Sequence, residues 1–174
     1  MNAKFLITAA LLGGLTMFFW GFVSHMLIPW WNVTMSEFSN DQAVIDAIKA
    51  GHADNGIYFS KQGVFAAVRF QPGVSDSTAD ISGYMIREFV NNMLIALVTA
   101  YLLFMAKPAT ILRRGFYAAV IGFAGWTMSS VGLWNWYGFS SAYTIVDLCD
   151  GVIGMFLVGL VIAWLMQKMK VVTA

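Results

Sequence analysis

The sequence predicts an all-α membrane protein: a bundle of four transmembrane helices with a small extracytoplasmic insertion, one helix and a β-hairpin, between helices 1 and 2. Three observations support this fold class. Hydrophobic residues make up 59% of the 174 residues and charged residues only 11%, against about 25% charged in ordinary soluble domains. Four apolar stretches are each long enough to cross a bilayer, which takes about 20 helical residues. One substantial polar region, residues 32–83, separates the first stretch from the second.

The first predicted span covers residues 5–31, which carry no formally charged side chain. A secretory signal peptide is the competing interpretation, but its apolar core would be about 7–15 residues long and followed by a small-residue cleavage site. Here the apolar run is longer and ends in Pro29, Trp30 and Trp31. We therefore expect an uncleaved transmembrane helix that ends in aromatic residues at the membrane interface.

The insertion is expected to begin with a short helix. Ser39, followed three residues later by Gln42, has the spacing of a capping box, in which Ser39 accepts a hydrogen bond from the first turn. A narrow apolar stripe follows and stops at Gly51, as helices commonly do. The pattern predicts an amphipathic helix of about three turns.

Two β-like runs follow at residues 56–60 and 64–70, and the three residues between them include Gly63. This length suits a hairpin loop, in which glycine can adopt a positive φ. Residues 71–74, Gln-Pro-Gly-Val, predict a type II turn. Because a lone two-stranded hairpin is marginally stable in water, we expect it to lie on the membrane surface, on the helix ends or on another protein.

The remaining predicted spans cover residues 84–106, 115–133 and 144–166. The second has polar first turns and an apolar remainder, and the third has no charged residue. Small residues recur in the third span at spacings of four and three, which is typical of close helix packing in lipid. This small-residue stripe consists of Ala118, Gly122, Gly125, Ser129 and Gly132.

Basic residues near the span ends predict the orientation. One side of the predicted bundle holds both termini and six basic residues without any acid, namely Lys4, Lys107, Arg113, Arg114, Lys168 and Lys170. The other side holds the four remaining basic residues and all nine acids. Because Lys and Arg near span ends favour the cytoplasm, we expect both termini to be cytoplasmic and the insertion to face outward.

Polar side chains from the spans are predicted to share one layer in the outer leaflet. At 1.5 Å per residue, His25 and Asp150 each lie about 9 Å inside the outer ends of their spans. A path for ions or protons would need polar groups at several depths, so a single layer argues against a pump or channel. The outer polar cluster consists of His25, Arg87, Glu88, Asn91, Asn92, Asp147 and Asp150.

Each ionisable member of this cluster also has a structural interpretation. Thr144 and Asp147 have the spacing of a capping box, so Asp147 is expected to cap the fourth helix. Asp150 lies beyond capping reach and is expected to pair with Arg87 or to bond with His25. We interpret His25 as a helix–helix contact rather than a metal or haem ligand, because a metal site would also need His52 to fold down from the loop.

Aromatic residues border the spans on the same side. Their rings are apolar at one end and polar at the other, which suits the membrane–water interface. We expect interfacial anchors rather than the walls of a quinone or pigment pocket. The five residues concerned are Trp30, Trp31, Trp134, Trp136 and Tyr137.

The chain resembles a family of small uncharacterised bacterial four-helix inner-membrane proteins. The resemblance rests chiefly on Trp134-Asn135-Trp136-Tyr137-Gly138-Phe139, followed by Thr144 and the Asp150-Gly151-x-x-Gly154 step. It implies a multi-pass protein of the cell inner membrane with the topology given above, and no activity or catalytic residue. The layout is also similar to that of claudin-like proteins, but their paired loop cysteines are absent, because Cys149 is the only cysteine.

No P-loop, GxSxG, HExxH or CxxC signature is present, and a net charge of +1 gives no indication of nucleic-acid binding. The leading hypothesis is therefore a non-enzymatic membrane protein, an accessory, assembly or binding subunit of a larger complex. Its partners would be the lipid bilayer and another membrane protein or a second copy. The alternative is a cofactor, quinone or metal site in the outer leaflet around His25 and Asp150, with the cofactor unknown. A small-solute carrier is a third hypothesis, disfavoured because the inner half lacks polar groups.

Overall fold

A computed structural model describes residues 3–51, 54–70, 81–107 and 110–171. The chain divides into two compact units: the helix bundle, Met1–Thr34 with Ser82–Ala174, and the insertion unit, Met35–Ile81. The helix bundle contains four helices that are long and apolar enough to cross a membrane, as the sequence predicts. The insertion unit contains one short helix and a two-stranded hairpin, which were also expected.

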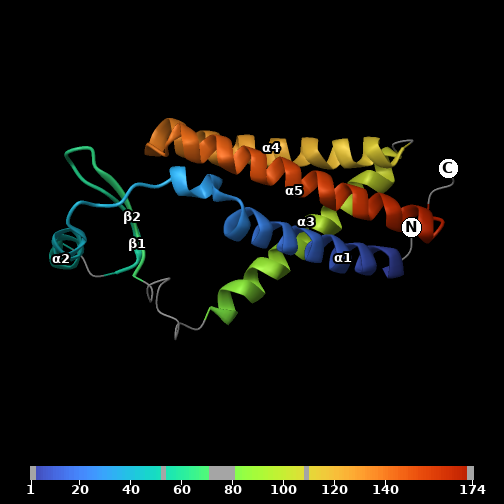
Figure 1. The fold of residues 1–174 in the computed structure, drawn as a ribbon, viewed down its shortest axis with the longest axis horizontal. Coiled ribbons are helices and arrows are strands. Elements are labelled where there is room, and N and C mark those ends of the chain that lie inside the picture. Colours follow the sequence, from blue (N-terminus) through green and yellow to red (C-terminus); the bar gives the residue numbers. More distant parts are fainter. Residues whose placement is uncertain (1–2, 52–53, 71–80, 108–109, 172–174) are drawn as a thin grey trace. The chain divides into compact units, whose positions relative to one another are not determined.

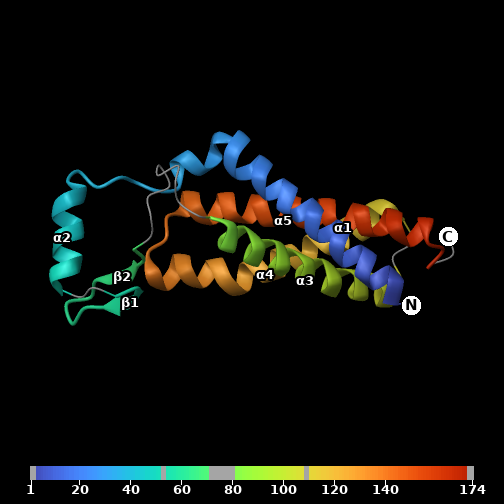
Figure 2. The ribbon, with the colours of Figure 1, turned by 90° about the horizontal axis from the view of Figure 1, so that it is seen from below.

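The helix bundle is built from α1 (Ala3–Phe22), α3 (Ser82–Ala106), α4 (Ile111–Tyr137) and α5 (Ser141–Lys168). Helix α5 packs on both α4 and α1, and α1 packs on α3, whereas α3 and α4 make few contacts. The start of α1, the end of α3, the start of α4 and the end of α5 lie together at one end of the bundle (Figures 1 and 2). We call this the terminal end, and the opposite end, where α4 turns into α5, the aromatic end.

The apolar core of the bundle lies toward the terminal end, where side chains of α1, α3 and α5 meet. The helices approach closely there because glycines lack a side chain. A Cβ on Gly13 of α1 would lie 2.7 Å from the Cβ of Ala96 in α3, and a Cβ on Gly159 of α5 would lie 2.6 Å from the Cβ of Ala118 in α4. The core cluster comprises Phe5, Ala9, Ala96, Ala100, Leu103, Val158, Ile162, Leu165 and Met166.

The prediction of one continuous helix over residues 5–31 is wrong beyond Leu27. Helix α1 runs into a π-helical turn, Val23–Leu27, and the helical path breaks at Ile28 before a 3₁₀ turn, Pro29–Val33. Pro29 has no N–H and disfavours helical geometry in the preceding residue. Ile28 accordingly has φ −97° and ψ 120°, an extended conformation.

Helices α4 and α5 are longer than the predicted spans because capping residues set their ends. The side chain of Thr110 accepts a hydrogen bond from the Arg113 N–H, and Gly138 ends α4 with φ 74°. The N-cap of α5 is Ser140, whose hydroxyl accepts a hydrogen bond from the Tyr143 N–H. The expected capping box of Thr144 and Asp147 is therefore wrong, because α5 already begins at Ser141, three residues before Thr144.

Only part of the small-residue stripe of α4 packs against another helix of the bundle. Ala118 is buried and Gly122 lies against Met155 of α5. Ser129 is exposed, and a Cβ on Gly125 or Gly132 would meet nothing within 4 Å. The contact with α5 continues instead through Trp126, whose indole donates to the Thr144 carbonyl, and through Ser130. Steps of four residues from Ala118 follow the contact line, whereas the predicted stripe turns away from it.

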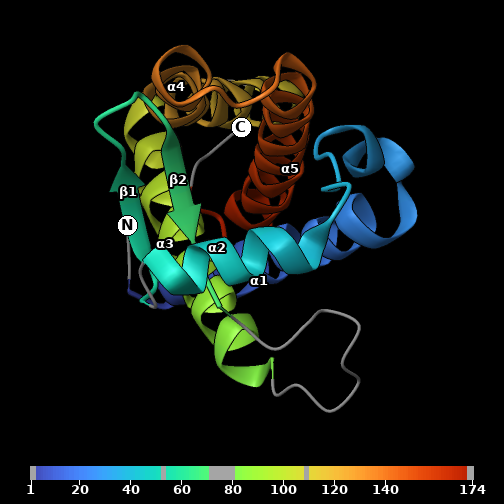
Figure 3. The same cartoon turned by 90° about the vertical axis from the view of Figure 1, so that its left-hand side faces the viewer.

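The insertion unit contains α2 (Asp41–Gly51) and the antiparallel strands β1 (Gly56–Phe59) and β2 (Phe65–Val68), which Figure 3 shows as opposed arrows. Gly63 in the hairpin loop has φ 88°, as expected for a glycine there. The N-cap of α2 is Asn40, whose side chain accepts from the Ala43 N–H, so the expected cap by Ser39 is one residue early. The predicted turn at residues 71–74 lies outside the described residues.

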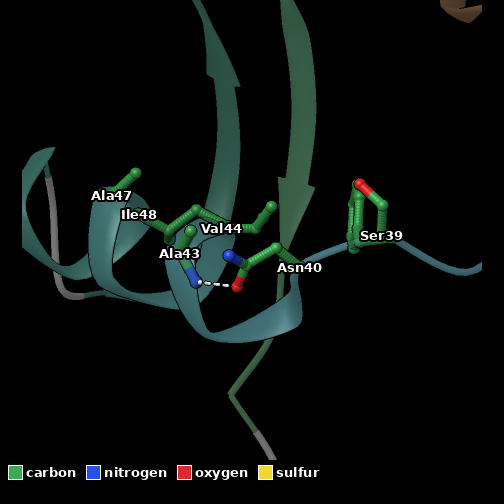
Figure 4. A pocket seen from close by; sticks show the side chains of 7 residues that line it. Ser39, Asn40, Ala43, Val44, Ala47 and Ile48 are labelled. Atoms are coloured by element: carbon green, nitrogen blue, oxygen red, sulfur yellow. Dashed lines mark hydrogen bonds between the residues drawn. The ribbon is translucent and has the colours of Figure 1, made fainter.

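An open groove runs along α2 (Figure 4). None of the side chains that line it is charged. The Asn40–Ala43 hydrogen bond, which caps the start of α2, lies beside it. The lining residues are Phe38, Ser39, Asn40, Ala43, Val44, Ala47 and Ile48. The apolar stripe that the sequence predicts for this helix, Val44, Ala47 and Ile48, lines part of this groove.

Candidate functional site

Ser24 organises the aromatic end of the bundle. It is fully buried in the π-helical turn. Its Oγ accepts hydrogen bonds from the Nε1–H of Trp30 (3.2 Å) and of Trp31 (3.1 Å), and its carbonyl lies 3.0 Å from Trp30 Nε1. The break before Pro29 lets the chain fold back so that two indoles share one hydroxyl. Sequence reasoning missed Ser24, although a serine one turn before a Pro-Trp-Trp run is a signal that could have revealed it.

A second set of hydrogen bonds fastens this folded-back segment to the start of α5. The Ser140 hydroxyl donates to the Thr34 carbonyl at 3.1 Å while it accepts the capping bond from Tyr143. The Thr34 hydroxyl donates to the Trp31 carbonyl at 2.7 Å. The extension of α1 is therefore held on the α4–α5 turn by residues that also cap a helix.

Four aromatic rings contact one another in sequence across this end, one pair stacked and two pairs edge to face. The His25 ring lies on Trp31 with centroids 4.5 Å apart, and Trp31 meets Tyr143 edge to face at 5.9 Å. Tyr143 in turn meets Phe139 at 5.0 Å. These ring contacts join the π-helical turn and the 3₁₀ turn to α5, so they also hold the extension of α1 against α5.

The predicted interfacial aromatics divide into two groups. Trp30 and Trp31 are half-buried and bonded to Ser24, whereas Trp134, Trp136 and Tyr137 are exposed in the last turns of α4. The Trp134 indole donates to the Ser141 hydroxyl at 3.1 Å. The exposed group is the one whose surroundings suit interfacial anchoring.

His25 is exposed, and one of its ring nitrogens is held by a hydrogen bond within its own helix. Its Nδ1 lies 3.0 Å from the Gly21 carbonyl oxygen. A carbonyl oxygen can only accept, so Nδ1 carries the hydrogen and the neutral ring keeps its lone pair on Nε2. The expected bond between His25 and Asp150 is not formed.

The two aspartates of α5 have different surroundings. The Asp147 carboxylate accepts a hydrogen bond from the Ser130 hydroxyl of α4, so it joins two helices. The Oδ1 atom of Asp150 is buried and has no hydrogen-bond partner among the described residues. Only the backbone of Asp150 is engaged, because its carbonyl accepts from Trp20 Nε1 at 3.0 Å.

The polar residues of α3 lie apart from these aspartates. Arg87 is exposed, donates from Nε to the Gly83 carbonyl at 3.0 Å and lies over the Tyr84 ring. It forms no ion pair with Asp150, so the pairing expected from the sequence is absent. The other members of the outer polar cluster on α3 are Glu88 and Asn91, which are exposed, and Asn92, which is buried.

The described residues contain no group of three His, Cys, Asp or Glu side chains that could hold a metal ion. His52, which the metal hypothesis required, lies outside them. The members of the outer polar cluster therefore do not form one site: His25 stacks on Trp31, Asp147 bonds to Ser130 and Arg87 bonds within α3. The Asp150 Oδ1 atom has no hydrogen-bond partner among the described residues. These groups donate and accept hydrogen bonds and bring aromatic rings into contact.

Comparison with known protein families, with curated proteins and with solved structures finds no match for the chain. No family is therefore assigned to it.

Proposed function

We propose that this protein is a non-enzymatic membrane subunit that assembles with another membrane protein through the uncovered face of α4. The observation that carries the proposal is the one-sided packing of α4. Its contact with α5 follows one line of residues, it makes few contacts with α3, and Gly125, Ser129 and Gly132 remain uncovered in the bundle.

The physical argument is that lipid offers no hydrophobic gain for helix association, so helices in membranes associate where small residues permit close backbone approach. A helix face that only met lipid would have no need of small residues. The Ser129 hydroxyl bonds within its own helix, to the Gly125 carbonyl at 3.0 Å, and so leaves the face without an unpaired donor. This face therefore suits a neighbouring helix.

The proposed setting is the inner membrane of a bacterial cell, with both termini in the cytoplasm. Lys4 lies in the first turn of α1 and Lys168 ends α5, and Arg113 and Arg114 lie in the first turn of α4. Basic residues concentrated at the terminal end support a cytoplasmic position for that end. In a Cys149→Ala background, Ser60→Cys should react with an impermeant thiol reagent in intact spheroplasts, while Lys170→Cys should not. The opposite labelling would reverse the orientation.

Cysteine cross-linking in native membranes tests the assembly role. Gly125→Cys is compared with Thr127→Cys, both without Cys149, because Thr127 is exposed at nearly the same depth on the opposite side of α4. A partner on the proposed face should give a cross-linked product at position 125 and none at 127. Mass spectrometry then distinguishes a different membrane protein from a second copy. Equal products at both positions, or none at either, would contradict the proposal.

A second candidate is a cofactor or quinone site in the outer leaflet, and His25 is the observation that favours it. π-Helical turns are rare and occur often at functional sites, and a histidine held through Nδ1 has the arrangement common in ligands. Protein purified in mild detergent would then carry a visible chromophore, extractable quinone or metal, and His25→Gln would lose it while staying folded. The solute-carrier hypothesis has less support, because the core cluster toward the terminal end is apolar.

A further inference from the structure

The described residues of the insertion unit include eight large apolar side chains that are exposed. None of its described residues is buried. Apolar patches of this kind mark interaction sites, and a hairpin with two strands is marginal by itself. The exposed large apolar residues of the unit are Met35, Phe38, Ile45, Ile57, Phe59, Val64, Phe70 and Ile81.

The paired strand residues carry no charge on either face, and one face exposes the large apolar side chains Ile57 and Phe59. The register places Ile57 opposite Ala67 and Phe59 opposite Phe65, and the pleat directs all four side chains to the same side. Ile57 is 76% exposed and Phe59 is 73% exposed. We call these four residues the uncharged hairpin face.

Both ends of the insertion unit connect to helices of membrane-spanning length, so a lipid bilayer would lie close to the unit. Met35 directly follows the first segment of the helix bundle, and Ile81 directly precedes α3, so both ends of the unit are joined to helices apolar enough to cross a membrane. Both connecting residues are themselves exposed and apolar. Because the tether keeps lipid near the unit, contact with it costs little translational freedom.

The net charge of the insertion unit favours zwitterionic lipid over two other contacts, a second copy of the unit and anionic lipid. Residues 35–81 contain six acidic and three basic residues, a net charge of −3. Two such units repel each other, and anionic lipid is disfavoured for the same reason. We propose that the uncharged hairpin face lies in the interfacial layer of the bilayer that holds the helix bundle, against zwitterionic lipid.

Two neighbouring alanines of β2 provide the test. Ala67→Cys labels the uncharged hairpin face and Ala66→Cys labels the opposite face, since successive strand residues point to opposite sides. Each variant, in the full chain without Cys149, is labelled with the fluorophore NBD and reconstituted in phosphatidylcholine vesicles. The label at position 67 should emit at shorter wavelength and be quenched by doxyl-labelled lipid, and the label at 66 should be quenched more by aqueous iodide. Phe59→Cys and Tyr58→Cys repeat the comparison on β1.

Other outcomes would overturn the inference. Stronger iodide quenching at position 67 than at position 66 would show that the face is in water. Equal lipid quenching at the two positions would show that the hairpin has no lipid-facing side, which also contradicts the proposal. Dilution of the protein with lipid distinguishes a second copy: lipid quenching at 67 that is independent of dilution supports the proposal. Quenching that appears only on dilution would show that another copy covers the face.

Discussion

Replacement of Gly159 by alanine tests the closest helix approach in the bundle. The added Cβ would lie 2.6 Å from the Cβ of Ala118, 2.8 Å from the Cα of Gly115 and 2.9 Å from the carbonyl oxygen of Arg114. Two of these atoms belong to the backbone and cannot rotate away. Carbon atoms pack at about 3.5–4.0 Å, so α4 and α5 would have to separate by about 1 Å.

The magnitude follows from a matched comparison with Gly125→Ala. Both substitutions replace a helix-interior glycine and gain about 0.5–1 kcal/mol of helix propensity. This gain cancels in the difference between them. A Cβ on Gly125 meets nothing within 4 Å, whereas overpacking typically costs about 1–3 kcal/mol. Gly159→Ala should therefore be less stable than Gly125→Ala by about 1–3 kcal/mol.

Thermal unfolding in dodecyl maltoside, followed by circular dichroism, measures the difference. For a chain of this size about 1 kcal/mol shifts Tm by about 2–4 °C, so Gly159→Ala should melt about 2–12 °C below Gly125→Ala. Equal melting temperatures, or a higher value for Gly159→Ala, would refute the close approach of α4 and α5.

Three further substitutions test the remaining contacts. Ser24→Ala should cost about 1–3 kcal/mol and shift tryptophan emission, because the Trp31 indole N–H loses its acceptor while Trp30 keeps the Ser24 carbonyl; an unchanged emission spectrum and Tm would count against this role. Asp147→Leu should lower Tm because Ser130 loses its acceptor, while Asp150→Leu should leave Tm unchanged or raise it, since its buried Oδ1 has no partner among the described residues. The reverse order of Tm values would contradict the assignment. Gly122→Leu should lower Tm, because its Cβ would lie 2.8 Å from Met155 Cγ, and an unchanged Tm would show that this contact line yields.

The number and type of the main elements were predictable because they depend on local properties. Stretches of about 20 apolar residues match the thickness of a bilayer, and the structure contains a helix for each. The hairpin was predictable because Gly63 supplies the positive φ of its loop. The helix ends were less predictable, because Ser39, Asn40, Ser140 and Thr144 are all acceptable caps and the surrounding structure selects among them.

The pairs expected at the candidate site are not formed, because residue counting gives depth along a helix and not direction around it. The counting predicts one layer for His25, Arg87 and Asp150, yet neither Arg87 nor His25 bonds to Asp150. Depth along a helix depends only on the 1.5 Å rise, whereas contact also requires that two side chains face each other across the bundle. The same distinction explains the small-residue stripe, which leaves the α5 contact line after Gly122.

The sequence by itself determined that the chain forms four long apolar helices and a polar insertion, since hydrophobic length and turn residues act locally. The break before Pro29 is also determined by the local sequence, although the predicted helix continued through it. Only the tertiary structure decided that the segment after that break bonds to the start of α5 through Thr34 and Ser140, and that Asp147 bonds to α4. These contacts join residues from elements whose relative rotation is set by the packing of all the helices together, and no local pattern contains that information.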